Sequence, residues 1–265
     1  MEITVAIICS SDVLISKCLK SISESTRILV ILNNPSEKIL DIVSNDSRVK
    51  TLRHDNLNLG YLRQLAADNI ETKGILYIDS DCVFEKGTIE IVSSELEEFS
   101  AVSIPMRYKR ESLSTSIVSK CREFTTPDSA LFIPAAFRID LQEKIGGYLY
   151  DKRLAWGEDS DQKKRLLKNN ISFKISKGLI WHCALNFCSD VKSAVRLGQG
   201  RVLQEKYGYF PKRNFWKDIL PFNDIRLSVK CAKKVGFLPS LYHLLVWRPA
   251  YKYGYWIRGR KIHGN

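Results

Sequence analysis

The first third of the chain alternates short apolar runs with segments of helical periodicity. The apolar runs predict four strands, at residues 3–9, 27–32, 49–53 and 74–78. The first, second and fourth are almost continuously apolar, as expected of parallel strands covered on both faces. Helices are expected between them, at residues 13–23, 36–44 and 62–70. This alternation predicts right-handed βαβ units and an α/β fold with a Rossmann-like, mostly parallel central sheet flanked by helices.

Beyond residue 80 the pattern is less regular. A further helix is expected at residues 88–98, and an amphipathic helix at 160–169 carries its basic residues toward its C-terminus, as the helix dipole favours. The remaining expected elements are strands at 101–108, 129–139 and 172–176 and helices at 189–206 and 224–234.

Polar residues follow each of the first four strands. In an open parallel sheet, ligands bind at the carboxyl ends of the strands, which here carry residues 9–12, 33–34, 54–58 and 79–81. None of these segments contains G-x-G-x-x-G or G-x-x-x-x-G-K. A classical dinucleotide site or a P-loop is therefore disfavoured.

Two acidic motifs stand out. Asp79-Ser80-Asp81 directly follows a buried strand, and Mg²⁺ or Mn²⁺ prefers such carboxylate oxygens, although a turn with solvated aspartates gives the same pattern. The second motif, Trp156-Gly157-Glu158-Asp159-Ser160-Asp161, lies where a helix begins. Acids in a first turn often serve only the helix dipole, which suits Asp161. Glu158 and Asp159 have no basic neighbour before Lys163 and are better candidates for chemistry.

The two motifs and their surroundings resemble a known family. The run HDNLNLGYLRQLAADNIETKGILYIDSDC resembles the N-x-G…R…L-D-x-D segment of family 2 glycosyltransferases, which have the GT-A fold. The run FIPAAFRIDLQEKIGGYLYDKRLAWGEDSDQKKRLLKNNISF resembles their later segment around w-G-E-D-x-D. The resemblance covers roughly residues 4–182, with the motifs in the right order and about 80 residues apart. Two ordered motifs are more specific than either one.

The resemblance implies an inverting transferase that uses a nucleotide-diphosphate sugar and a divalent cation, Mn²⁺ or Mg²⁺. On the donor side it implies that Ser10 lies in the first nucleotide-contacting loop and that Asn33 and Arg63 lie near the base and diphosphate. Asn33 replaces an acid usual in the family, which leaves the nucleotide open, with UDP favoured. Cys9 also stands where the family often has proline.

The resemblance also implies the roles of the acids. Asp79 would contact the ribose or sugar and contribute to the metal site, and Asp81 would hold the metal. Asp159 would be the general base, with Glu158 beside it. Members of the family often have a histidine near position 182, so His182 is a candidate third metal ligand; a histidine packed beside Trp181 is the alternative.

On this basis residues 1–222 are expected to form the catalytic domain. Its nucleotide-sugar-binding half would span residues 1–108 and its acceptor half residues 109–222. Residues 223–265 would form a basic, aromatic and helical C-terminal extension.

Charge and composition sharpen the picture of that extension. The 265-residue chain has a net charge of +12, but residues 225–265 hold nine basic residues and no acidic one. The excess describes a basic tail rather than a globally basic protein, so nucleic acid is not expected as a partner. Its aromatic residues favour contact with an anionic membrane surface, with a helix packed on the domain as the alternative. The residues in question are Phe237, Tyr242, Trp247, Tyr251, Tyr253, Tyr255 and Trp256, interleaved with Arg248, Lys252, Arg258, Arg260 and Lys261.

The cysteine pattern, the N-terminal run and the length of the apolar stretches bear on where the protein is located. Seven cysteines without a C-x-x-C pair favour a reducing compartment, the apolar N-terminal run has no basic region before it, and no apolar stretch reaches the ~20 residues of a membrane span. We expect a cytoplasmic protein associated peripherally with the inner face of the membrane.

The function expected is transfer of a sugar, with UDP as the favoured carrier, to a hydroxyl of a saccharide or lipid-linked acceptor in cell-surface polysaccharide synthesis. One alternative is a nucleotidyltransferase acting on sugar phosphates, which usually has a Gly-rich basic loop where residues 9–12 read CSSD. The other is an inactive sugar- or membrane-binding scaffold, against which the intact acidic motifs argue.

Overall fold

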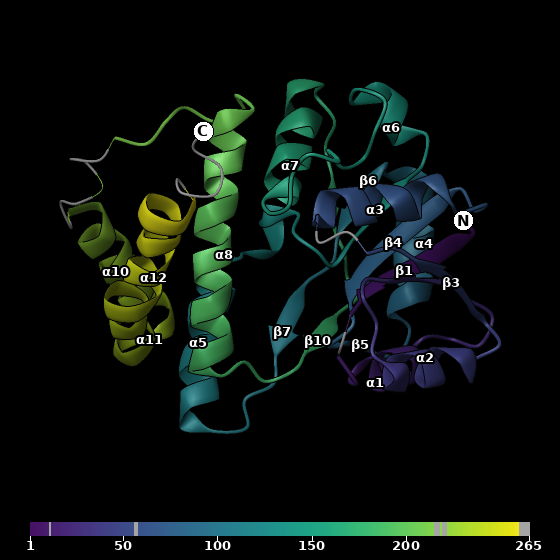
Figure 1. Ribbon diagram of the computed structural model, residues 1–265, viewed down its shortest axis with the longest axis horizontal. Helices are drawn as coiled ribbons and strands as arrows, with labels where there is room; N and C mark the ends of the chain where they lie inside the picture. Colours follow the sequence, from purple (N-terminus) through teal and green to yellow (C-terminus); the bar gives the residue numbers. More distant parts are fainter. Residues whose placement is uncertain (11, 56–57, 215–217, 219–221, 260–265) are drawn as a thin grey trace. The chain divides into compact units, whose positions relative to one another are not determined.

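The protein forms two compact units in the computed structural model, which describes residues 1–10, 12–55, 58–214, 218 and 222–259 (Figure 1). The first unit comprises residues 1–107 and 128–183, and the second comprises residues 108–127 and 184–265. The domain boundaries expected at residues 108 and 222 stay a prediction.

A seven-stranded sheet forms the centre of the first unit, in the order β3-β2-β1-β4-β8-β6-β9. Neighbouring strands are parallel except where β8 pairs antiparallel with β4 and β6. The prediction of an α/β fold with a mostly parallel sheet is therefore confirmed. The strands are β1 (Ile3–Cys9), β2 (Arg27–Leu32), β3 (Val49–Arg53), β4 (Gly74–Asp79), β6 (Ala101–Ser103), β8 (Ala135–Arg138) and β9 (Lys174–Ile175).

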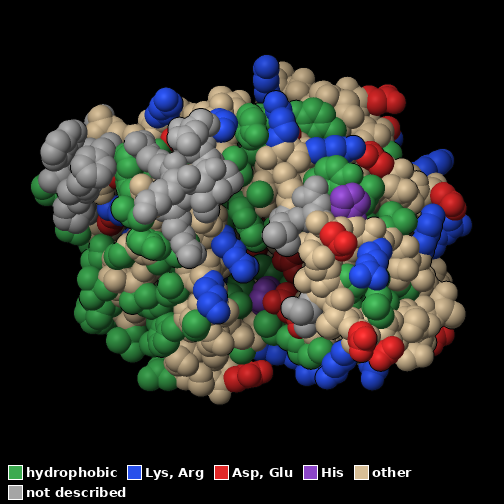
Figure 2. All heavy atoms as spheres, in the orientation of Figure 1, with side chains coloured by type: hydrophobic (Ala, Val, Ile, Leu, Met, Phe, Trp, Pro, Cys, Tyr) green, Lys and Arg blue, Asp and Glu red, His purple; other side chains and the backbone are tan. Residues whose placement is uncertain are grey.

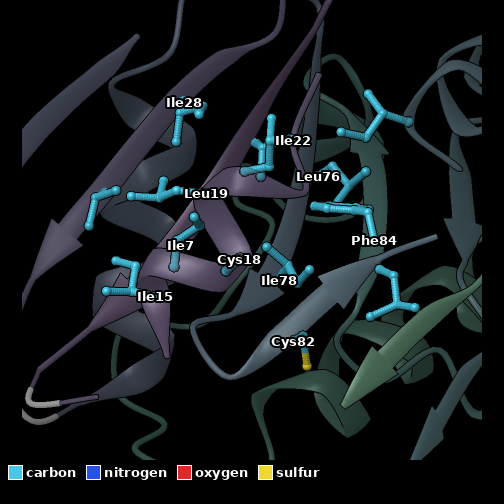
Figure 3. Packing of buried hydrophobic residues seen from close by; sticks show 14 of the residues in the cluster. Ile7, Ile15, Cys18, Leu19, Ile22, Ile28, Leu76, Ile78, Cys82 and Phe84 are labelled. Atoms are coloured by element: carbon cyan, nitrogen blue, oxygen red, sulfur yellow. The ribbon is translucent and has the colours of Figure 1, made fainter. Parts of the chain in front are cut away.

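Helices cover both faces of this sheet. Alternate residues of β1 point to opposite faces, so Val5 and Ile7 join the cluster with α1, α2 and α4, whereas Ala6 joins the cluster with α3 and α7. Figure 3 shows the first cluster, with Ile15, Cys18 and Leu19 of α1 packed over the sheet. The helices are α1 (Ile15–Lys20), α2 (Glu37–Ser44), α3 (Leu59–Asp68), α4 (Thr88–Glu98), α6 (Leu141–Lys144) and α7 (Glu158–Lys168), with a 3₁₀ turn η1 (Asp128–Ala130).

The strand order reverses at β1. The chain runs outward from β1 through β2 to β3 and then returns to place β4 on the other side of β1. Ile8 of β1 is in register with Asp79 of β4, so the loops after these two strands are neighbours. Such a reversal leaves a crevice at the carboxyl ends of the strands, where ligands bind in α/β proteins.

A small sheet brings the end of the first unit back to this edge. It has the order β5-β10-β7, from β5 (Cys82–Phe84), β10 (Ile180–His182) and β7 (Met106–Tyr108). Strands β10 and β5 are antiparallel, and His182 is in register with Cys82. The pairing therefore places His182 beside the residue that follows the acidic motif.

Three of the expected strands are shorter than their apolar patterns suggest, and the run 172–176 keeps only Lys174–Ile175 as β9. The stretch 101–108 divides at Pro105, which has no N–H for a ladder, into β6 of the large sheet and β7 of the small one. The stretch 129–139 keeps only Ala135–Arg138 as a strand, after Pro134. A proline interrupts both of these runs. The prediction followed the apolar pattern and gave too little weight to these prolines.

The second unit is helical. Its elements are α5 (Leu113–Thr125), α8 (Phe187–Lys206), α10 (Phe222–Val235), α11 (Phe237–Tyr242) and α12 (Arg248–Tyr253), with π-helical turns η2 (His243–Trp247) and η3 (Gly254–Gly259). The helical nature expected of the C-terminal segment is confirmed. Helix α5, which the apolar pattern did not predict, begins at a capping box between Ser112 and Thr115. None of the helices in the described part of the chain is long and apolar enough to cross a membrane.

The C-terminal segment packs closely on α8. A Cβ atom built on Gly198 of α8 would lie 2.2 Å from the backbone oxygen of Tyr251, and one on Gly254 would lie 2.1 Å from that of Val195. Glycine at both positions allows the backbones to meet. Tyr242, Trp247 and Tyr255 are buried, so three of the aromatic residues expected at a membrane surface belong to the core instead.

Buried charges in this unit are paired. Arg122 of α5 donates to Asp190 of α8, which also accepts from the Tyr242 hydroxyl at 2.6 Å. Arg248 and Lys252 lie 2.6 and 2.5 Å from the Asp224 carboxylate. Two of the basic side chains counted in the tail therefore serve folding.

His243 predicts a pH dependence of stability. Its ring is fully buried, stacks on Trp247, and has no hydrogen-bond partner for either nitrogen among the described residues. Burial lowers the pKa of His243 to about 4, aided by Arg248 and opposed by Asp224. Because the unfolded chain takes up this proton first, the free energy of unfolding should fall by about 3 kcal/mol as pH drops from about 6.5 to 4.

Urea denaturation at several pH values measures this effect. In His243→Phe the fall over that range should be about 3 kcal/mol smaller than in the wild type, because the ring that must stay neutral is gone. Parallel curves for the two proteins would contradict the assignment.

Candidate active site

The first acidic motif lies at the end of β4. Asp79 is the last residue of the strand, and its side chain is about half exposed; Asp81 follows before β5. Between them, the Ser80 hydroxyl donates to Asp12 at 3.3 Å, and Asp12 accepts from the backbone N–H of Leu14 at 2.9 Å. The loops after β1 and β4 are thus joined through Asp12.

The second acidic motif begins α7. Glu158 and Asp159 are the first two residues of the helix, after Gly157, whose φ of 81° is unfavourable for other residues. Glu158 is buried, whereas 16% of the Asp159 side chain is accessible. Both carboxylates face the positive end of the helix dipole.

Arg63 joins the two motifs. Its Nη1 donates to Glu158 and, at 2.9 Å, to Oδ1 of Asp159, and its Nη2 lies 3.9 Å from Oδ1 of Asp79. The guanidinium is buried with its centre 5.6 Å from the ring centroid of Tyr150. One side chain therefore gathers three of the four sequence-predicted acids.

The backbone near Arg63 is held from both sides. The backbone carbonyl of Arg63 accepts a hydrogen bond from the Tyr77 hydroxyl of β4 at 2.8 Å. Three residues earlier, the N–H of Gly60 donates to the carbonyl of Leu154 at 2.9 Å, and a Cβ at Gly60 would lie 2.2 Å from the carbonyl oxygen of Asp151. Glycine at position 60 thus sets the separation between α3 and the segment that leads into α7.

Burial and Arg63 set the protonation of the cluster. Burial raises the pKa of Glu158 to about 7, against the opposing charge of Arg63 and with the help of Asp159. Burial also raises the pKa of Asp159, with Arg63 and a backbone hydrogen bond from Ile133 opposing it. Burial opposes the charge of Arg63, but Asp159 and Glu158 outweigh it, so the pKa of Arg63 is raised. A carboxylate with a raised pKa is suited to accept a proton near neutral pH.

Asp81, His182 and Cys82 form a candidate metal site. Nε2 of His182 lies 3.3 Å from Oδ2 of Asp81, and one donor atom from each of the three residues lies within 4.8 Å of the others. Cys183 adds a thiol 3.5 Å from the same carboxylate oxygen. The carboxylate and imidazole of this set fit Mn²⁺ better than Mg²⁺, which strongly prefers oxygen, whereas burial raises the pKa of the Cys82 thiol and disfavours its ligation as a thiolate. The residues therefore fit a divalent cation.

Ser10 and Asn33 lie at the same edge of the sheet, after β1 and β2. Ser10 is exposed. Asn33 is buried, its N–H donates to the carbonyl of Cys9 at 2.9 Å, and its Oδ1 has no partner in the described part of the chain. A buried acceptor without a donor indicates a place where a ligand group would be satisfied. His54 packs against Tyr61, and residues 56 and 57 lie outside the described residues.

Sequence reasoning missed several residues that support the site. Asp12 joins two loops, Tyr77 and Tyr150 contact Arg63, and Cys82 and Cys183 flank the Asp81–His182 pair. Asp12 follows β1 at a strand end, which is a usable signal. No sequence signal indicates Tyr150 or Cys183, because their places in the site depend on contacts between segments that are distant in sequence.

Comparisons with known proteins bear on the family and the fold of the chain. The profile of the family described as "Glycosyl transferase family 2" matches residues 7–183, and this match ends where the first unit ends. The chain belongs to glycosyl transferase family 2. A comparison with curated proteins found no match.

Among solved structures, this family 2 chain is similar to TarS of S. aureus. The crystal structure of TarS 1–349 matches with a TM-score of 0.53 at 15% identity, covering 100% of this chain and 92% of that chain. The same segment in complex with UDP-GlcNAc matches with a TM-score of 0.54 at 15% identity, covering 100% and 93%. At such identity the likeness concerns the fold, and it confirms the predicted GT-A architecture.

The Arg63 cluster predicts a strong stability effect. Arg63→Met leaves Glu158 and Asp159 as buried carboxylates without their partner, which should lower the free energy of unfolding by about 3–5 kcal/mol. Adding Glu158→Gln should restore part of this loss, because one uncompensated charge disappears. Denaturant unfolding of both variants measures the difference.

Arg27→Met is the matched control, since Arg27 is exposed and pairs only across the surface with Glu2 and Glu71 among the described contacts. Its loss should be within about 1 kcal/mol. A similar loss for Arg63→Met would show that the buried cluster is not a structural link.

Proposed function

We propose that this family 2 protein is an inverting, hexosyl-type glycosyltransferase that moves a sugar from a nucleotide-diphosphate donor to an acceptor hydroxyl. The observation that carries the proposal is the contact of one guanidinium, Arg63, with Asp79 on one side and Glu158 and Asp159 on the other. An inverting displacement needs a donor-binding group and a base on opposite sides of one sugar carbon. The cluster supplies carboxylates for both tasks within the reach of one side chain.

The donor proposed is a UDP-sugar. TarS, which shares the fold, has been crystallised with UDP-GlcNAc and with UDP. In this chain, the buried Oδ1 of Asn33 without a partner supports the same base, because uracil presents a ring N–H that such an oxygen can accept. Ser10 and Asp79 would lie along the ribose and diphosphate, at the carboxyl ends of β1 and β4.

Asp159 is proposed as the general base. It is the more accessible of the two acids that begin α7, and its raised pKa favours taking the acceptor's proton as the hydroxyl oxygen attacks. The proton moves to an oxygen of the Asp159 carboxylate while the bond from the sugar to the diphosphate breaks. Glu158, buried and bonded to Arg63, would orient the arginine beside the base.

A divalent cation is proposed as the resident metal. Asp81 and His182 of the described cluster would hold it and the imidazole favours Mn²⁺, while Asp79, which lies outside that cluster beside Arg63, would join them as the sequence resemblance implies. When bound, it supplies positive charge that neutralises the departing diphosphate.

The acceptor is proposed to be a saccharide or lipid-linked glycan in cell-surface polysaccharide synthesis, reached by a cytoplasmic protein at the inner face of the membrane. The family membership supports a glycan acceptor in general terms. The resemblance of the sequence to family 2 supports the cell-surface polysaccharide as the acceptor and the inner face of the membrane as the location.

Removing the base tests the chemical part. Asp159→Asn should lower the rate of sugar transfer or donor hydrolysis by about 10²- to 10⁴-fold, because an amide cannot take the proton. Binding of UDP-GlcNAc, measured by calorimetry, should change little. Asp41→Asn, on the exposed face of α2, is the control and should keep full activity. An active Asp159→Asn enzyme would reject Asp159 as the base.

The metal is tested without turnover. UDP should raise the melting temperature of the wild type more in the presence of Mn²⁺ than in its absence, because only the folded state holds both. The extra shift should vanish in Asp81→Ala and shrink in His182→Ala, while Asp41→Asn keeps it. An equal shift with and without Mn²⁺ in the wild type would contradict a metal site for donor binding.

A further inference from the structure

Large apolar side chains are exposed together on the C-terminal helices of the second unit. The side chains of Phe222 and Phe237 are 72% and 71% exposed, a far larger fraction than is usual for phenylalanine in a packed helix. Figure 2 shows hydrophobic side chains gathered over α10, α11 and α12. The apolar face is defined here as Phe222, Ile225, Val229, Phe237, Leu238, Leu241 and Leu245, all classed as exposed.

The spacing of these residues makes one continuous strip. Phe222, Ile225 and Val229 lie three and four residues apart on α10 and therefore share one side of the helix. Phe237, Leu238 and Leu241 follow on α11, which contacts α10 extensively. A groove of about 500 Å³, lined by residues of α10, α11 and Leu244, opens on this strip. An exposed apolar patch of this kind marks an interaction surface.

Basic residues border the strip. Arg226, Lys230, Lys233 and Lys234 of α10 are all exposed. The sequence from residue 225 to residue 265 contains no acidic residue. The apolar face is thus bordered by positive charge, and the nearest acid in sequence, Asp224, is buried and paired with Arg248 and Lys252.

The other conspicuous tail residues are committed to folding. Tyr242, Trp247 and Tyr255 are buried, and Arg248 and Lys252 pair with Asp224. Most of the exposed apolar surface is therefore carried by α10 and α11, with Leu245 of η2 beside them, and Tyr253 is the aromatic residue of α12 that stays about half exposed.

The chemistry of this face selects its partner. A second copy docking through the same face would bring two basic borders together, which disfavours a symmetric dimer. An anionic bilayer offers acyl chains to the apolar strip and negative headgroups to the basic residues. We propose that α10 and α11 form a membrane-docking face that lies in the headgroup boundary of an anionic bilayer. This goes beyond sugar transfer and does not depend on the donor chemistry.

Vesicle flotation of the full chain tests the docking face. The wild type should float with vesicles of equal parts phosphatidylglycerol and phosphatidylcholine, and much less with phosphatidylcholine alone. The double variant Phe237→Ser, Leu241→Ser should bind the mixed vesicles at least about tenfold more weakly, because two exposed apolar side chains that would enter the bilayer are lost. The variant Lys230→Glu, Lys233→Glu should lose about tenfold or more and should also lose most of the salt dependence.

Two matched controls separate docking from general surface effects. Leu167→Ser removes a leucine that is 58% exposed on α7, and Lys38→Glu, Lys50→Glu reverses two exposed charges of the first unit. Both should float like the wild type. Thermal melting and UDP binding verify that every variant is folded. Point variants are used in place of a deletion of residues 236–265, because that deletion would remove core residues and unfold the second unit.

The flotation and sedimentation results either support or overturn the docking face. Weaker flotation of both face variants, with unchanged controls, supports the docking face. Equal flotation of wild type and face variants overturns it, and so does equal binding to neutral and anionic vesicles. Sedimentation of the lipid-free wild type as a dimer that Phe237→Ser, Leu241→Ser converts to a monomer would also overturn it, in favour of a second copy.

Discussion

The first unit depends on keeping one arginine charged inside the protein. A buried guanidinium costs several kcal/mol of desolvation unless carboxylates and hydrogen bonds surround it. Arg63 meets this need with Glu158, Asp159 and, more distantly, Asp79, so three segments must come together before the charge is tolerated. Gly60 permits the close approach that this contact requires. Structure and candidate chemistry are therefore set by the same ion cluster.

Much of the fold could be predicted because the signals were local. Strands β1, β2 and β3 agree with their apolar runs residue for residue, and β4 extends one residue beyond its expected end, to Asp79. The pairing of Arg63 with Glu158 and Asp159 could not be predicted from spacing, since it joins residues 95 and 96 positions apart. Only the packing of α3 on the segment before α7 decides that contact.

The C-terminal segment shows a different limit of sequence reasoning. Its basic and aromatic content was plain, but composition does not say which side chains face the core. Trp247 is buried and Phe237 is exposed, although both are aromatic residues in helical segments of the same stretch. Asp224 explains part of the outcome, because one buried acid draws Arg248 and Lys252 inward. Among the described side chains of this segment, the exposed basic residues are those of α10.

The charge balance of the first unit leads to the proposed cation. Asp79, Glu158 and Asp159 lie around Arg63, Asp81 lies beside His182 two residues after Asp79, and a diphosphate would add further negative charge near them. With its pKa raised to about 7, Glu158 can take up a proton and remove one charge. The Asp81 carboxylate has the imidazole of His182 beside it at 3.3 Å. Repulsion between this carboxylate and a diphosphate is best relieved by a cation between them, which is why the donor and the metal are proposed to bind together.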